Sequence, residues 1–157
     1  MIEQIYTYFT TEMIFMWSNL GVLPFWLVLI IFPQSQICRV FITSIFPILI
    51  LSLAYGYSLY LFLNDGYDFI RNFKLYLGLD AVSNLFSDKS FIVLFWLHFL
   101  AMNLFCGGWI VKDSQKFGVN KILMSFPLLI TYFIGPIGLT IYWIIRIFYA
   151  KRINLYD

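Results

Sequence analysis

The segment SFIVLFWLHFLAMNLFCGGWIVKDSQ, residues 90–115, decides the fold class of this chain. Residues 91–111 within it carry no charged side chain. A helix that crosses a bilayer needs about 20 apolar residues at about 1.5 Å of rise each. The segment therefore predicts a transmembrane helix, and His98, the single histidine of the chain, lies near its middle.

The composition of the whole chain extends this interpretation. Of the 157 residues, 62% are hydrophobic and 11% are charged, whereas about 25% are charged in an ordinary soluble domain. Four uncharged runs are long enough, or nearly so, to cross a membrane, at residues 13–33, 40–64, 91–111 and 122–145. We therefore predict one all-α integral membrane domain over residues 1–157, a four-transmembrane-helix bundle.

Between the second and third runs, residues 67–88 mix charges with recurring apolar positions. Phe69, Phe73 and Leu77 are spaced i, i+4, i+8, and a second apolar set follows Gly78. This pattern predicts one or two short amphipathic helices on the bilayer surface. They could cap a cavity between the spans or serve as a tether.

The small number of charged residues indicates a membrane protein, but their distribution does not decide its orientation. A net charge of +2 suggests no nucleic-acid partner. With four spans, the side that holds both termini carries six cations: Arg71, Lys74, Lys89, Arg146, Lys151 and Arg152. The opposite side carries four: Arg39, Lys112, Lys116 and Lys121. A division of six cations against four does not decide the orientation. The prediction is a multi-pass membrane protein, which in a bacterium would lie in the inner membrane.

The polar side chains inside the spans are candidates for a site. An unpartnered hydrogen-bonding group at the bilayer centre is costly, so we expect His98 and Asn103 to face protein. In an antiparallel bundle Asn19 lies at nearly the depth of His98, and Tyr132 lies at a comparable depth. A cluster of Asn19, His98, Asn103 and Tyr132 is sterically possible.

The fourth run contains the strongest break in the chain, Gly135-Pro136-Ile137-Gly138. Pro136 has no backbone N–H, so the carbonyl of Tyr132 loses its helical donor. A neighbouring side chain or a water in a cavity must satisfy that oxygen.

Several candidate residues allow two interpretations. His98 could be an imidazole that joins helices by a hydrogen bond, or a functional group. Asp113 could be a helix-end residue in a solvated loop, or part of a site. Cys38 and Cys106 show no metal-ligand spacing, and no nucleotide or cofactor motif is present.

Four stretches of the sequence carry a resemblance to a known family. The chain resembles the abscisic-acid-deficient-four-like family in WLHFLAMNLFCGGWIVKDSQKFGV and PLLITYFIGPIGLTIYWIIR, and also in SNLGVLPFWLVLIIFP and LDAVSNLF. These are small integral membrane proteins whose plant members are needed to form the carotenoid neoxanthin. The most specific features are Trp96-x-His98, Leu104-Phe105, Trp109, Asp113 and the Gly135-Pro136-Ile137-Gly138 motif. An aspartate usually stands in the family where this chain has Asn103, and an asparagine cannot titrate.

The resemblance implies a protein that modifies a carotenoid or another isoprenoid inside the bilayer, or the required partner of such an enzyme. Isomerase-type chemistry would make His98 the acid or base. Asn103 would orient the imidazole or the substrate, and the substrate-binding set would be Asn19, Trp109, Tyr132 and Asp113. The alternative is a non-enzymatic helix bundle that binds lipid or carotenoid, or that scaffolds another membrane protein. A small transporter has the least support, because no inverted repeat is evident.

Overall fold

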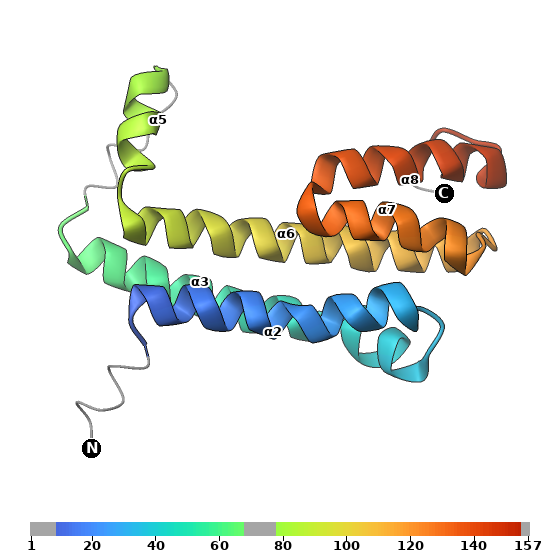
Figure 1. Ribbon diagram of the computed structural model, residues 1–157, viewed down its shortest axis with the longest axis horizontal. Helices are drawn as coiled ribbons and strands as arrows, with labels where there is room; N and C mark the ends of the chain where they lie inside the picture. The colour runs from blue at the N-terminus through green and yellow to red at the C-terminus, as the bar shows by residue number, and fades with distance from the viewer. Residues whose placement is uncertain (1–8, 68–77, 155–157) are drawn as a thin grey trace. The chain divides into compact units, whose positions relative to one another are not determined.

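The computed structural model describes residues 9–67 and 78–154, and these are helical throughout, with turns between the helices (Figure 1). No strand occurs in the described ranges. The elements are α2 (Thr11–Ile31), the π-helix η1 (Cys38–Ile42), α3 (Phe46–Asn64), α5 (Leu79–Leu85), α6 (Lys89–Lys116), α7 (Lys121–Phe133) and α8 (Gly135–Ala150). The all-α prediction is therefore confirmed.

Three of the described helices are long and apolar enough to cross a membrane, namely α2, α3 and α6. They contain 21, 19 and 28 residues, and the mean hydropathy of their most apolar windows is 1.8 to 2.0. About 20 residues cover the roughly 30 Å hydrocarbon core. The first three predicted spans thus correspond to helices of sufficient length.

The fourth predicted span is not confirmed as a span. The apolar run divides into α7, of 13 residues, and α8, of 16 residues, which at about 1.5 Å per residue are roughly 20 and 24 Å long. Ile134 leaves the helical region with φ −139° and ψ 80°. Pro136 then occupies the first turn of α8, where its missing N–H costs no hydrogen bond.

The two short helices form a helical hairpin. In Figure 1, α8 (red) returns alongside α7 (orange). At the turn the backbone of Gly138 lies directly on Thr131, so that a Cβ atom at this position would collide with Thr131. The motif interpreted from sequence as a break inside one span is instead the reversal between two helices.

The segment between α3 and α6 is described in part. Helix α5 falls within the predicted interfacial region and has no buried residue. The predicted helix around Phe69 and Phe73 lies outside the described residues. That this segment lies on the bilayer surface remains a prediction.

The described residues group into two compact units. The first comprises Met1–Leu20 and Ile50–Leu100, and the second comprises Gly21–Leu49 and Ala101–Asp157. Aromatic rings occupy the first unit, for example Phe62 against Phe91 with centroids 6.1 Å apart. The second unit contains the α7–α8 hairpin and the C-terminal part of α6. The single domain over residues 1–157 stays a prediction.

Candidate functional site

In the first unit, Asn19 of α2 is hydrogen-bonded to two protein groups. Its amide nitrogen donates to the carbonyl of Phe15 at 2.7 Å, and its amide oxygen accepts from the indole nitrogen of Trp96 at 2.9 Å. The Phe15 and Trp96 rings also pack, with centroids 5.7 Å apart. Asn19 therefore joins α2 to α6, and its oxygen retains one further lone pair that could accept a hydrogen bond.

His98 lies on α6 with its side chain exposed. Within the described residues we find no hydrogen bond or ion pair to its imidazole. Among residues 9–67 and 78–154, the expectation that His98 faces protein is therefore not met. An unpartnered polar group in an apolar environment is costly, so an imidazole exposed to lipid needs a hydrogen-bonding group from elsewhere.

In the second unit, Asn103 of α6 contacts the tip of the α7–α8 hairpin. The residue is 6% exposed, and its amide nitrogen lies 3.5 Å from the carbonyl oxygen of Tyr132. That oxygen is the one that Pro136 deprives of its helical donor. The amide oxygen of Asn103 lies so close to Gly135 that a Cβ atom there would collide with it. Two predicted site residues, Asn103 and Tyr132, are thus brought together, and Asn103 supplies the donor expected from a neighbour.

The ring of Tyr132 makes a further contact within the second unit. It packs edge-on against the indole of Trp26 in α2, with centroids 5.4 Å apart. Trp26 is 3% exposed and also lies on Gly107 of α6. The packing of α2, α6 and α7 therefore depends on the absence of a side chain at Gly107.

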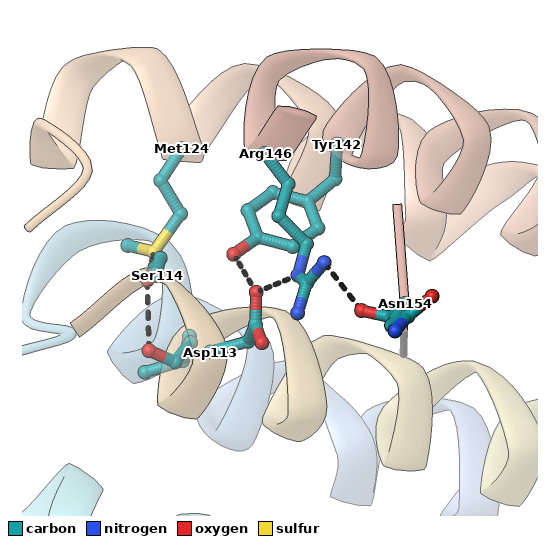
Figure 2. A network of polar contacts seen from close by, with 7 residues as sticks. Asp113, Ser114, Met124, Tyr142, Arg146 and Asn154 are labelled. Carbon is teal, nitrogen blue, oxygen red and sulfur yellow. Dashed lines mark hydrogen bonds and ion pairs between the residues drawn. The ribbon is translucent and has the colours of Figure 1, made fainter. Parts of the chain in front are cut away.

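Asp113, in the last turns of α6, is the centre of a buried polar network (Figure 2). Its Oδ2 atom accepts from the hydroxyl of Tyr142 at 2.7 Å and from Nε of Arg146 at 2.8 Å. The Arg146 and Asp113 side chains are 1% and 9% exposed. Nη1 of Arg146 also donates to the carbonyl of Asn154 at 2.9 Å, and its guanidinium lies 4.9 Å from the ring centroid of Phe117.

This network includes two residues that sequence interpretation missed, Tyr142 and Arg146. The four-span prediction puts Arg146 on the side of both termini, across the membrane from Lys112. Tyr142 and Arg146 are spaced i, i+4, so they share a face of α8, and this spacing was the available signal. Buried charge needs a counter-charge, and Asp113 supplies it.

A cleft of about 320 Å³ opens on one face of α6 in the second unit. Leu104, Phe105, Gly108, Trp109 and Lys112 recur at the helical spacing that places them on one face. The opposite wall consists of residues 42–45 and Ile48, from the end of η1 to the start of α3. Trp109, predicted to bind substrate, lines this cleft, and its ring also meets the ring of Tyr142 edge-on at 5.7 Å.

The two ends of the cleft differ in polarity. Lys112 and Thr43 are polar lining residues; the hydroxyl of Thr43 donates to the carbonyl of Arg39 at 3.1 Å, which leaves its oxygen able to accept. The Ser44 hydroxyl makes two hydrogen bonds, since it donates to the carbonyl of Phe41 and accepts from the N–H of Phe46 at the start of α3. The other end, around Leu104 and Phe105, is apolar. The cleft therefore suits an apolar molecule with an oxygen-bearing end.

The described residues contain no group of three His, Cys, Asp or Glu side chains that could hold a metal ion. The absence of metal and cofactor stays a prediction. Cys38 in η1 is fully buried, and burial raises the pKa of its thiol to about 11. The thiol is therefore protonated at neutral pH and is a poor nucleophile.

Comparison with known proteins places these features in a family. Residues 13–142 match the family described as ABA DEFICIENT 4-like. The chain is also similar to Protein ABA DEFICIENT 4, chloroplastic, from Arabidopsis thaliana, with 22% identity over 135 residues. The match covers 85% of this chain, and the chain spans about 60% of the length of that curated relative. No solved structure matches the chain. Because the family match takes in well over half of the sequence, the chain belongs to the ABA DEFICIENT 4-like family.

Proposed function

We propose that this membrane protein handles a carotenoid or related isoprenoid, either by modifying it or as the required partner of the enzyme that does. The observation that carries the proposal is the mostly apolar cleft on α6, whose lining includes Trp109 and Lys112. The family to which the chain belongs supports the class of ligand. The membrane setting supports it too, because such a ligand dissolves in the bilayer.

The size and polarity of the cleft fit one end of such a molecule. Its volume of about 320 Å³ is at the lower limit of ordinary ligand sites, which are typically about 300 to 1,000 Å³. An end ring could pack on Trp109 and Phe105, while an oxygen on that ring meets the Lys112 ammonium or the Thr43 hydroxyl. The remainder of a long molecule would extend along the apolar surface into the bilayer.

Isomerase-type chemistry would need a proton donor and acceptor at the reacting end. In the catalytic form of this proposal His98 exchanges the proton, because an imidazole can both donate and accept one. Asn103 and Asn19 were the candidates to orient it. Both amides are engaged elsewhere, Asn103 by the Tyr132 carbonyl and Asn19 by Trp96.

That engagement favours the second candidate function, a non-enzymatic binding or scaffold protein. The exposed imidazole of His98 would then pair with a partner protein in the membrane rather than with substrate. Asn103 stands where the family usually has an aspartate, and an amide cannot act as an acid or base. The two functions differ in whether His98 is needed for a chemical change in the pigment.

The test is the pigment profile of a carotenoid-producing bacterial host that expresses the chain. Gly108→Leu adds a side chain to the lining of the cleft, and its Cβ atom has no neighbour within 4 Å. Gly21→Leu is the matched control, since Gly21 is equally open and lies outside the cleft. We expect a changed pigment profile with the wild type and Gly21→Leu, and its loss with Gly108→Leu.

The outcomes separate the hypotheses. Loss of the new pigment with His98→Ala would support catalysis, and retention would support handling by a partner. A folded and abundant Gly108→Leu protein with the wild-type profile would show that the cleft is not the site. If the wild type changes no pigment and co-purifies with none, the proposed ligand class is wrong.

A further inference from the structure

We propose that the α7–α8 hairpin enters and leaves the membrane from the same side, and that its cationic end lies on the face with anionic lipid headgroups. The proposal does not depend on the function of the cleft. It joins the fold of the C-terminal region to the distribution of charge along the chain.

The ion pair between Asp113 and Arg146 carries the first step. In a single straight helix over residues 122–145, Arg146 would lie roughly 36 Å from the start of the helix. Asp113 precedes that start, at the end of α6, so it would lie across the bilayer from Arg146. Instead Nε of Arg146 is 2.8 Å from Oδ2 of Asp113. The end of α8 therefore returns to the end of α6.

Other contacts at the same end agree with this return. Tyr142 donates to Asp113, and Nη1 of Arg146 reaches the carbonyl of Asn154. The guanidinium of Arg152 lies 5.3 Å from the centroid of the Phe117 ring, which follows α6. Segments on both sides of the hairpin thus meet, as Figure 2 shows for Asp113, Arg146 and Asn154.

With α2, α3 and α6 as the spans, connectivity then assigns each charge to a side. One side carries seven cations, Arg39, Lys112, Lys116, Lys121, Arg146, Lys151 and Arg152, and two carboxylates, Asp113 and Asp157. The other side carries three cations, Arg71, Lys74 and Lys89, and six carboxylates, Glu3, Glu12, Asp65, Asp68, Asp80 and Asp88. With a fourth span the cations would divide six against four between the two sides, whereas with the hairpin they divide seven against three.

This asymmetry predicts both the orientation and the partner of the cationic end. Lysine and arginine are retained on the cytoplasmic side of a bacterial inner membrane, whose surface is negatively charged. Six of the seven cations are exposed: Arg39, Lys112, Lys116, Lys121, Lys151 and Arg152. Arg146 is buried and neutralised by Asp113, so it holds the hairpin rather than a headgroup. The exposed six are placed to contact lipid phosphates.

The experiment is cysteine accessibility of the full chain in a Gram-negative bacterial host. Single cysteines replace three exposed residues, Gln36, Ser87 and Asn154, in a Cys38→Ala, Cys106→Ala background. The probe is a thiol reagent that crosses the outer membrane and not the inner membrane. We expect Ser87→Cys to label in intact cells. We expect labelling of Gln36→Cys and Asn154→Cys to rise several-fold only after permeabilisation.

A second readout keeps the native cysteines. Alkaline phosphatase, active only in the periplasm, is inserted after Ser87 or fused after Asp157 of the intact chain, and we expect activity only at Ser87. If Ser87 and Asn154 label from the same side, the hairpin is a fourth span and the proposal is overturned. If Gln36 and Asn154 label together from outside, the re-entrant path stands but the assignment to the anionic face is overturned.

Discussion

Two adjacent glycines in α6 offer a matched test of how the second unit is packed. Gly107 and Gly108 differ only in what a side chain would meet. A Cβ atom at Gly107 would lie 2.8 Å from Cη2 of Trp26, closer than carbon atoms approach in proteins, whereas one at Gly108 has no neighbour within 4 Å. The indole of Trp26 is buried and also packs against Tyr132, so it has little room to withdraw.

The expected free energies follow from two opposing effects. Replacing glycine by alanine inside a helix stabilises it by up to about 1 kcal/mol. Forcing a methyl group into packed surroundings costs about 1 to 3 kcal/mol. Gly108→Ala should therefore gain up to about 1 kcal/mol from helix propensity alone. Gly107→Ala carries both effects and should fall below Gly108→Ala by about 1 to 3 kcal/mol.

The assay is thermal unfolding of both variants in the same detergent, followed by helical circular dichroism. A chain of this size shifts its midpoint by roughly 2 to 4 °C per kcal/mol, so the two midpoints should differ by several degrees. The order should be Gly107→Ala, then the wild type, then Gly108→Ala. Equal midpoints for the two variants would refute the seating of Trp26 on Gly107.

Three further predictions concern the hairpin, the ion pair and the buried thiol. Asp113→Asn leaves Arg146 buried without its counter-charge and should lower the free energy of unfolding by about 3 to 5 kcal/mol. Adding Arg146→Met should restore most of that stability. A double variant that recovers none of it would contradict the pairing. Gly135→Ala should cost about 1 to 3 kcal/mol because its methyl group meets Asn103, and a midpoint equal to the wild type would remove that contact. Because burial raises the pKa of Cys38 to about 11 from 9.0, less thiolate is present at each pH below 11. Alkylation of the folded protein should therefore rise through about pH 11, and of the unfolded chain through about pH 9; coinciding profiles would show that the thiol is open to solvent.

Three helices long and apolar enough to cross a membrane could be predicted from sequence, because their uncharged runs reach the length of a bilayer crossing. The fourth run had the same property and still folds differently. Gly135 and Pro136 mark a break, and a break allows either a kinked span or a reversal. Run length and hydropathy do not separate these two cases. The separation comes from a long-range pair, Asp113 with Arg146, which sequence interpretation had assigned to opposite ends of a span.

The contact between Asn103 and the Tyr132 carbonyl followed from local chemistry. Proline removes a known donor, and a buried carbonyl must find another. The surroundings of His98 could not be predicted in the same way. Residues 91–111 are apolar almost all round the helix, so periodicity does not tell which face meets protein. The expectation for His98 rested on the cost of an isolated polar group, and that cost is equally relieved by a partner outside the chain.

The proposed orientation also bears on how a ligand would lie in the cleft. Lys112 is adjacent to Asp113, whose pairing with Arg146 marks the cationic end of the second unit. Leu104 and Phe105 lie about 10 to 12 Å further along α6, toward the centre of the helix. A molecule in the cleft would therefore place its oxygen-bearing end near the headgroups of the cationic face and its hydrocarbon toward the bilayer centre. Any chemistry in the cleft would act on the end of the molecule at that face.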